Sequence, residues 1–140
     1  MRSRDTLIRL KRFQVDEKRR RVVQTESMIA DFERMCTDLD REISNEEAKS
    51  GISDIAHFAY PTYAKAAMAR RDNIRQSITN LHIQLEQARI ELQEAYEELK
   101  KVEILEDRET TRDRSVKAMR DQMEMDRIGL SRPTQFNPNR

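Results

Sequence analysis

Few side chains of this sequence could carry out chemistry. The chain has two histidines, His57 and His82, and one cysteine, Cys36. A zinc site of the common kind needs four ligands at short spacing, and the sequence contains no such cluster. Cys36 falls within an apolar heptad pattern, so we expect a small core residue rather than a nucleophile. Two glycines cannot build a glycine-rich phosphate loop. From these observations together we predict that the protein is not an enzyme, with no catalytic residue, metal, cofactor or small-molecule substrate.

The strongest charge cluster is the basic run Lys18-Arg19-Arg20-Arg21. Such a run can bind the phosphates of nucleic acid, but no aromatic residue interleaves it to stack on bases. The whole chain carries 27 basic and 26 acidic residues, so no global field attracts nucleic acid or a membrane. We therefore predict no nucleic-acid partner. The run is either a solvated helix face or a contact surface for a protein, through Arg19, Arg20 and Arg21.

The segment IAHFAYPTYAK, residues 55–65, holds three of the seven aromatic residues of the chain. Phe58, Tyr60 and Tyr63 could close the end of a helical core. They could also form an exposed tip that contacts a partner, since tyrosine and phenylalanine are frequent interface anchors. The sequence leaves both interpretations open.

The composition is typical of long helices. Charged residues make up 38% of the chain, against about 25% in an ordinary globular protein. Two glycines and three prolines are too few for the many turns of a sandwich, barrel or wound sheet, so those folds are excluded. No stretch approaches the length of a membrane span, and the N-terminus shows no secretory signal. We expect a cytoplasmic protein without direct membrane insertion.

Two apolar stripes predict two coiled-coil helices. From Ile8 to Ile43 an apolar residue returns at every seventh position. From Ile74 to Val102 apolar residues alternate at spacings of three and four. Both patterns are typical of helices that pair through one seam.

Helix-breaking residues suggest the boundaries. Gly51 can take the left-handed conformation that ends a helix, and Pro61 can stand at the start of the next one. Residues 1–128 are therefore expected to form a single hairpin. Its parts are a first helix over about 4–50, a bend over about 51–61 and a second helix over about 62–127. Gly129, Pro133 and Pro138 favour a disordered tail over 129–140.

The two stripes match if the chain folds back near residues 56–57, so that residue i faces roughly residue 113 − i, with Ile8 opposite Leu105. Residues 1–21 carry nine bases and three acids and would face 92–112, with four bases and seven acids. Residues 22–50 carry three bases and eight acids and would face 63–91, with five bases and three acids. Opposite charges along the whole pair favour antiparallel pairing. The predicted fold is an all-α, long antiparallel two-helix coiled coil.

In this register the second helix projects roughly 20 residues beyond the first. The projecting end is either a solvated, charge-rich single helix or a segment that a partner covers. In the second case Met119, Met123 and Met125 are the expected contact residues, because methionine adapts to irregular surfaces.

Three segments resemble the FliJ family of flagellar export proteins, in its alphaproteobacterial form. They are SRDTLIRLKRFQVDEKRRRV, GISDIAHFAYPTYAKAAMARRDNI and EAYEELKKVEILEDRE, and the resemblance covers about residues 3–110. It implies a cytoplasmic component of the flagellar type III export apparatus, peripherally associated with that apparatus at the inner membrane. Members of this family are coiled coils similar to the rotary stalk of F-type ATPases, and none of their residues is catalytic.

The resemblance also implies partners. They are the hexameric flagellar export ATPase, whose pore the stalk enters and whose activity it stimulates, the cytoplasmic part of the membrane export gate, and the export chaperones. By analogy, the basic end with Arg19, Arg20 and Arg21 is expected at the ATPase and the aromatic bend at the gate. The alternative is a coiled-coil scaffold or adaptor without an ATPase partner.

Overall fold

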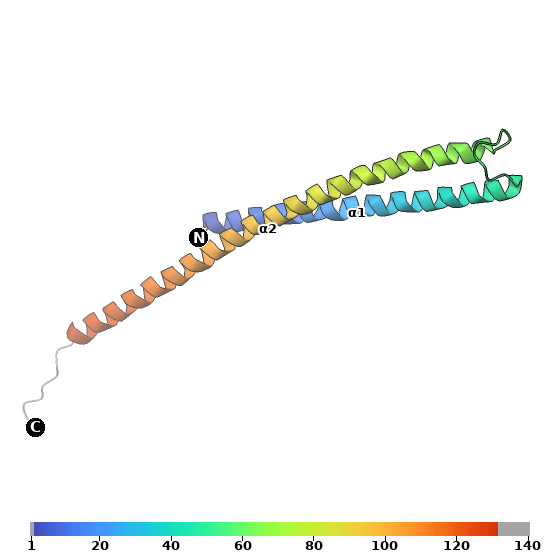
Figure 1. Cartoon of the computed structure of the whole chain (residues 1–140). Helices are drawn as coiled ribbons and strands as arrows, with labels where there is room; N and C mark the ends of the chain where they lie inside the picture. The colour runs from blue at the N-terminus through green and yellow to red at the C-terminus, as the bar shows by residue number, and fades with distance from the viewer. Residues whose placement is uncertain (1, 132–140) are drawn as a thin grey trace, which may run out of the picture.

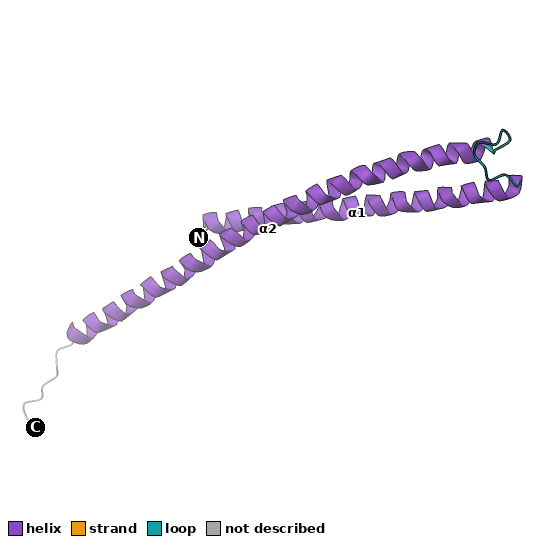
Figure 2. Ribbon diagram, in the orientation of Figure 1, coloured by secondary structure: helices purple, strands orange, loops and turns teal. Residues whose placement is uncertain are grey.

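The chain forms two long antiparallel helices joined by a short bend, as Figure 1 shows. The computed structural model describes residues 2–131. Helix α1 spans Arg2–Ser50 and helix α2 spans Thr62–Ser131. Figure 2 shows the two helices and the loop between them, with no strand among the described residues. The predicted all-α helical hairpin is confirmed.

The heptad positions of α1 form the buried side of the rod. Every seventh residue from Val15 to Ile43 is buried, because these positions return to the side of the helix that faces α2. The buried residues gather in two core clusters along the seam. The cluster in the middle of the rod consists of Val22, Ile29, Leu81, Leu85 and Ala88. The cluster beside the bend consists of Leu39, Ile43, Tyr60, Ala64 and Ala67.

Ion pairs between the helices confirm the antiparallel register and its charge pattern. Near the N-terminus, Arg4 pairs with Glu106 at 3.5 Å and also with Glu109. Nearer the bend the signs are exchanged, and Asp40 of α1 accepts a hydrogen bond from Arg71 of α2 at 2.8 Å. Partly exposed pairs of this kind contribute little to stability. They specify which way the helices run rather than how tightly they pack.

The predicted pairing of Ile8 with Leu105 is wrong, since Leu105 is 57% exposed. The seam of α2 runs instead through Val102 and Glu106, which are both half-buried. Spacings of three and four from Leu99 reach these two positions. Leu105 therefore lies one position away, on the flank of the seam.

The bend is shaped by one glycine and one proline. Gly51 has a positive φ of 71°, and its N–H donates to the carbonyl of Glu47 at 2.9 Å. Gly51 ends α1 in the left-handed conformation. Other residues adopt this conformation at a steric cost, which glycine avoids because it has no Cβ atom. At the other side the carbonyl of Pro61 accepts a hydrogen bond from the N–H of Lys65 at 3.1 Å. Pro61 therefore caps α2 directly before its first residue.

Helix α2 continues to Ser131, whereas the sequence pattern suggests an end near 127 and a tail from 129. Residues 129–131 are helical, so this part of the tail prediction is corrected. A single glycine inside a helix costs only about 1 kcal/mol, and Gly129 is therefore accommodated. Residues 132–140 lie outside the described residues.

Among residues 2–131, no second helix lies beside the end of α2. Figure 1 shows α2 continuing well past the N-terminus of α1. Every residue from 111 to 130 is exposed. The rod is thus double along the hairpin and single at one end.

Candidate interaction surfaces

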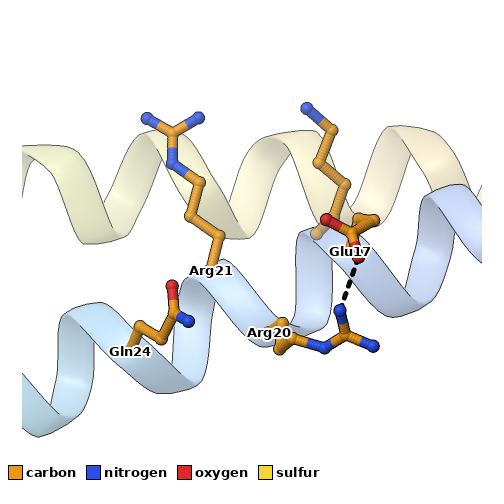
Figure 3. Close-up of a pocket in the computed structure, with 5 residues that line it drawn as sticks. Glu17, Arg20, Arg21 and Gln24 are labelled. Carbon is orange, nitrogen blue, oxygen red and sulfur yellow. Dashed lines mark hydrogen bonds and ion pairs between the residues drawn. The ribbon is translucent and has the colours of Figure 1, made fainter.

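The basic run of α1 divides into two parts with different neighbours. Arg19 pairs with Asp16 at 3.3 Å and Arg20 pairs with Glu17 at 2.6 Å, one turn back on the same helix. Arg21 reaches across to α2 and pairs with Glu91 at 3.2 Å. Figure 3 shows this divergence, with Arg20 directed at Glu17 and Arg21 pointing toward the second helix. Of the four basic residues in this run, only Arg19 and Arg20 therefore take no part in the ion pairs between the two helices.

Two cations of α1 hold one carboxylate of α2. Lys18 and Arg21 both donate to the same Oε2 atom of Glu91, each at 3.2 Å. The hydrogen bond from Lys18, followed by that from Gln87, lowers the pKa of Glu91 below its ordinary value of 4.5. We name this group, Lys18, Arg21 and Glu91, the Glu91 clamp.

The lowered pKa predicts a pH-dependent contribution of the Glu91 clamp to stability. A carboxyl group with a depressed pKa stabilises the folded state above its unfolded pKa, and this gain disappears as the pH falls through the folded value. We expect Glu91→Gln to lower the melting temperature at pH 7 and to have a shrinking effect as the pH falls below about 4.5. Circular dichroism melts of both proteins from pH 7 to pH 2 measure the difference. Glu94→Gln, at an exposed position of the same helix, is the control. A constant difference at every pH would contradict the assignment.

The three aromatic residues of the bend have separate environments. Tyr60 is 5% exposed and belongs to the core cluster beside the bend. Its hydroxyl donates to Glu47 at 2.8 Å, and burial together with this bond raises the pKa of Tyr60. Phe58 is 97% exposed and stacks on His57, with the ring centroids 4.7 Å apart. The core interpretation therefore holds for Tyr60, and Phe58 is left as the exposed tip.

Tyr63 borders a groove that the sequence analysis did not predict. Its hydroxyl donates to Glu42 of α1 at 3.0 Å, which holds the ring over the junction of the two helices, and this bond raises the pKa of Tyr63. The groove is lined by Met35, Asp38, Leu39, Glu42, Tyr63, Arg70 and Ile74. Because residues of both helices line the groove, it can be recognised only when the register of the hairpin is known. Met35, next to the heptad stripe, is the one signal in the sequence.

The predicted contact residues of the projecting end are exposed, at 64% for Met119 and 68% for Met123. They belong to an apolar stripe on α2, which we call the α2 stripe. Its members are Leu105, Val116, Met119, Met123 and Leu130, all of them exposed. Glu109 and Arg112 separate Leu105 from the other members. Exposed apolar residues gathered on one side of a helix are typical of a protein contact surface.

Within residues 2–131, no three histidine, cysteine, aspartate or glutamate side chains come close enough together to hold a metal ion. Cys36 lies buried on the seam, as expected for a core residue. In the described part of the chain, no helix combines the length and the apolar character that crossing a bilayer requires.

Comparison with known proteins identifies a family. The family model described as "Flagellar FliJ protein" matches residues 3–135, which includes both helices and the bend. Neither the curated proteins nor the solved structures contain a match. The hairpin fold and the family match agree with the resemblance of the three sequence segments. The chain therefore belongs to the FliJ family, and it is a component of the flagellar protein export apparatus.

Proposed function

We propose that this protein is the stalk of the flagellar export ATPase. In this proposal its single-helix end enters the pore of the hexamer and stimulates ATP hydrolysis, the bend end meets the cytoplasmic part of the export gate, and the rod also contacts export chaperones. No residue of the rod takes part in the chemistry of ATP hydrolysis. The protein acts through its shape and its surfaces.

The observation that carries the proposal is the long single-helix extension of a stiff hairpin. Helix α2 has 70 residues and is about 105 Å long at 1.5 Å per residue. Helix α1 has 49 residues, so it leaves the last part of α2 uncovered. A narrow, extended helix can enter a pore that a globular domain cannot. Its exposed α2 stripe offers apolar contacts to the wall.

The charge of the same end supports this orientation. Residues 1–21 carry nine basic and three acidic side chains. Arg19 and Arg20 remain available because their ion pairs are local and exposed. In this proposal the basic N-terminal part of α1 meets acidic groups at the mouth of the hexamer.

The direct test is a titration of the flagellar export ATPase with this protein. We expect ATP hydrolysis to rise and to saturate near one rod per six ATPase subunits, because one stalk fills one pore. An ATPase rate that does not change, with the helicity of the rod intact, would contradict the proposal. The scaffold alternative would then take its place.

We predict that reversing two arginines weakens this stimulation without unfolding the rod. The change is Arg19→Glu with Arg20→Glu, and Arg21 is left intact because it belongs to the Glu91 clamp. Reversal of two interface charges should reduce the apparent affinity for the ATPase about tenfold, mainly at low salt. The measurement is the half-saturating rod concentration in the ATPase titration.

Arg34→Glu with Arg41→Glu is a closely matched control. These arginines are exposed and pair one turn back with Asp31 and Asp38 on the same helix, but they lie nearer the bend. Both double variants therefore exchange the same charges in the same local setting. If the control weakens stimulation as much as the test variant, the basic end has no special role.

For the bend end we propose a contact with the export gate through Phe58. Its ring is nearly fully exposed, so Phe58→Ala should leave the rod intact. We expect this variant to stimulate the ATPase normally and to reduce motility in a complementation assay. Normal swimming and secretion would contradict the assignment of the bend to the gate. Tyr60 is unsuitable for this test because it is part of the core.

A further inference from the structure

We propose that the α2 stripe also pairs with its counterpart on a second copy of this chain, forming an antiparallel two-fold dimer through the projecting ends. This goes beyond the proposed function, because it needs no ATPase, gate or chaperone. The proposal rests on the position of the α2 stripe, on its symmetry and on the charges beside it.

The position of the α2 stripe makes it a continuation of the hairpin. At the first described turn of α1, Arg4 pairs with Glu106 and Glu109 of α2. From residue 111 to residue 130 every side chain of α2 is exposed. A second helix that lies on residues 111–130 would therefore extend the two-helix rod, and it would come next to the start of α1 at Glu106 and Glu109, which pair with Arg4.

The α2 stripe is nearly its own mirror image along the helix, which an antiparallel pair of identical helices requires. If Val116 lies opposite Met119 of the second copy, Leu105 lies opposite Leu130. Each of these contacts occurs twice by symmetry. Apolar residues then meet at both ends and in the middle of the overlap, and the overlap of 105 to 130 is about 39 Å long.

Charged residues beside the α2 stripe complement each other in the same alignment. Asp113 lies diagonally across from Arg120 of the second copy, two positions from the directly opposite residue. Glu106, which also pairs with Arg4 of its own chain, is related in the same way to Arg127. Both pairs occur twice, at the flanking positions where charges select orientation in coiled coils.

Other layers oppose the pairing and keep it weak. Met123 would face Arg112, and Glu109 would face Asp126. Two carboxylates in one layer repel each other, so the dimer should form only at high protein concentration. The two-fold dimer covers the α2 stripe and thereby excludes the single-helix end from any other contact. A partner that binds the single-helix end must therefore first dissociate the dimer.

The test uses two reciprocal charge variants of the full chain in sedimentation equilibrium. In Asp113→Arg, two bases face each other across the two-fold axis, and in Arg120→Asp two acids do. Each variant alone should dimerise roughly tenfold more weakly than the wild type, because two attractive pairs become repulsive. An equimolar mixture should dimerise again, since each copy then supplies what the other lacks. All the changes lie outside the hairpin core, so the helicity should not change.

The chain offers a matched control pair. Arg114 and Asp121 have the same seven-residue spacing and the same charges, but at about 100° per residue they lie on the side of α2 away from the α2 stripe. Arg114→Asp and Asp121→Arg should leave dimerisation unchanged, alone and mixed.

Two results would overturn the proposal. One is a wild-type chain that stays monomeric up to about 1 mM, which would leave the α2 stripe to the export machinery. The other is a dimer that tolerates Asp113→Arg and Arg120→Asp, which would place the contact elsewhere. Because the measurement contains no ATPase, neither result affects the stalk proposal.

Discussion

Replacing Leu85 with alanine is expected to lower the free energy of unfolding by about 3 kcal/mol. Leu85 is 5% exposed and packs with Val22, Ile29 and Leu81 in the middle of the rod. A two-helix rod has a single layer of core side chains. When one leucine is shortened, few neighbouring side chains are available to move into the gap, so most of its packing energy is lost. Urea or thermal unfolding curves, monitored through the helical content of the protein, should therefore shift clearly.

Ile83→Ala is the control for Leu85→Ala. Ile83 lies two residues away on the same helix and is 66% exposed. It loses a similar amount of apolar side chain, but from a surface that already meets water. We expect a change within about 0.5 kcal/mol. Equal losses from the two variants would show that the seam assigned to α2 is wrong.

The second large effect is expected at the bend, where Tyr60→Ala should lower the melting temperature by about 5–10 °C. The substitution removes a buried ring from the cluster that holds Ile43, Ala64 and Ala67. It also removes the hydroxyl that bonds Glu47, which ties α1 to the end of the bend. Tyr60→Phe keeps the ring and should cause a smaller decrease, since only the hydrogen bond is lost.

Phe58→Ala provides the contrast within the same bend. Its ring is exposed and contacts His57, so truncation should leave the melting temperature nearly unchanged. A thermal melt of the three variants separates a core tyrosine from a surface phenylalanine. If Phe58→Ala were as destabilising as Tyr60→Ala, the tip would be part of the core and the gate assignment would lose its basis.

The sequence by itself determined the architecture of this protein. A seven-residue repeat from Ile8 to Ile43 and a stripe of three-and-four spacing from Ile74 to Val102 specify two helices with one apolar seam each. Charges of opposite sign in the matched segments specify that the helices run antiparallel. These features are readable because a long helix repeats one local rule many times, and an error at a single position does not alter the pattern.

Only the tertiary structure decided the role of individual side chains beside the seam. Arg19, Arg20 and Arg21 are indistinguishable as a run of bases, yet Arg21 joins α2 through Glu91 and the other two do not. Successive residues on a helix point about 100° apart. Which of them reaches the neighbouring helix therefore depends on where that helix lies and on which acid it presents.

The same reason separates the aromatic residues of the bend and displaces Leu105 from the seam. Phe58 and Tyr60 are two residues apart, but the path of the chain after Gly51 directs only Tyr60 into the core. Leu105 is one position away from a seam residue and is exposed. Periodicity determines that a helix has an apolar side. The register of its partner determines which residues at the edge of that side are covered, because burial needs a second surface in contact.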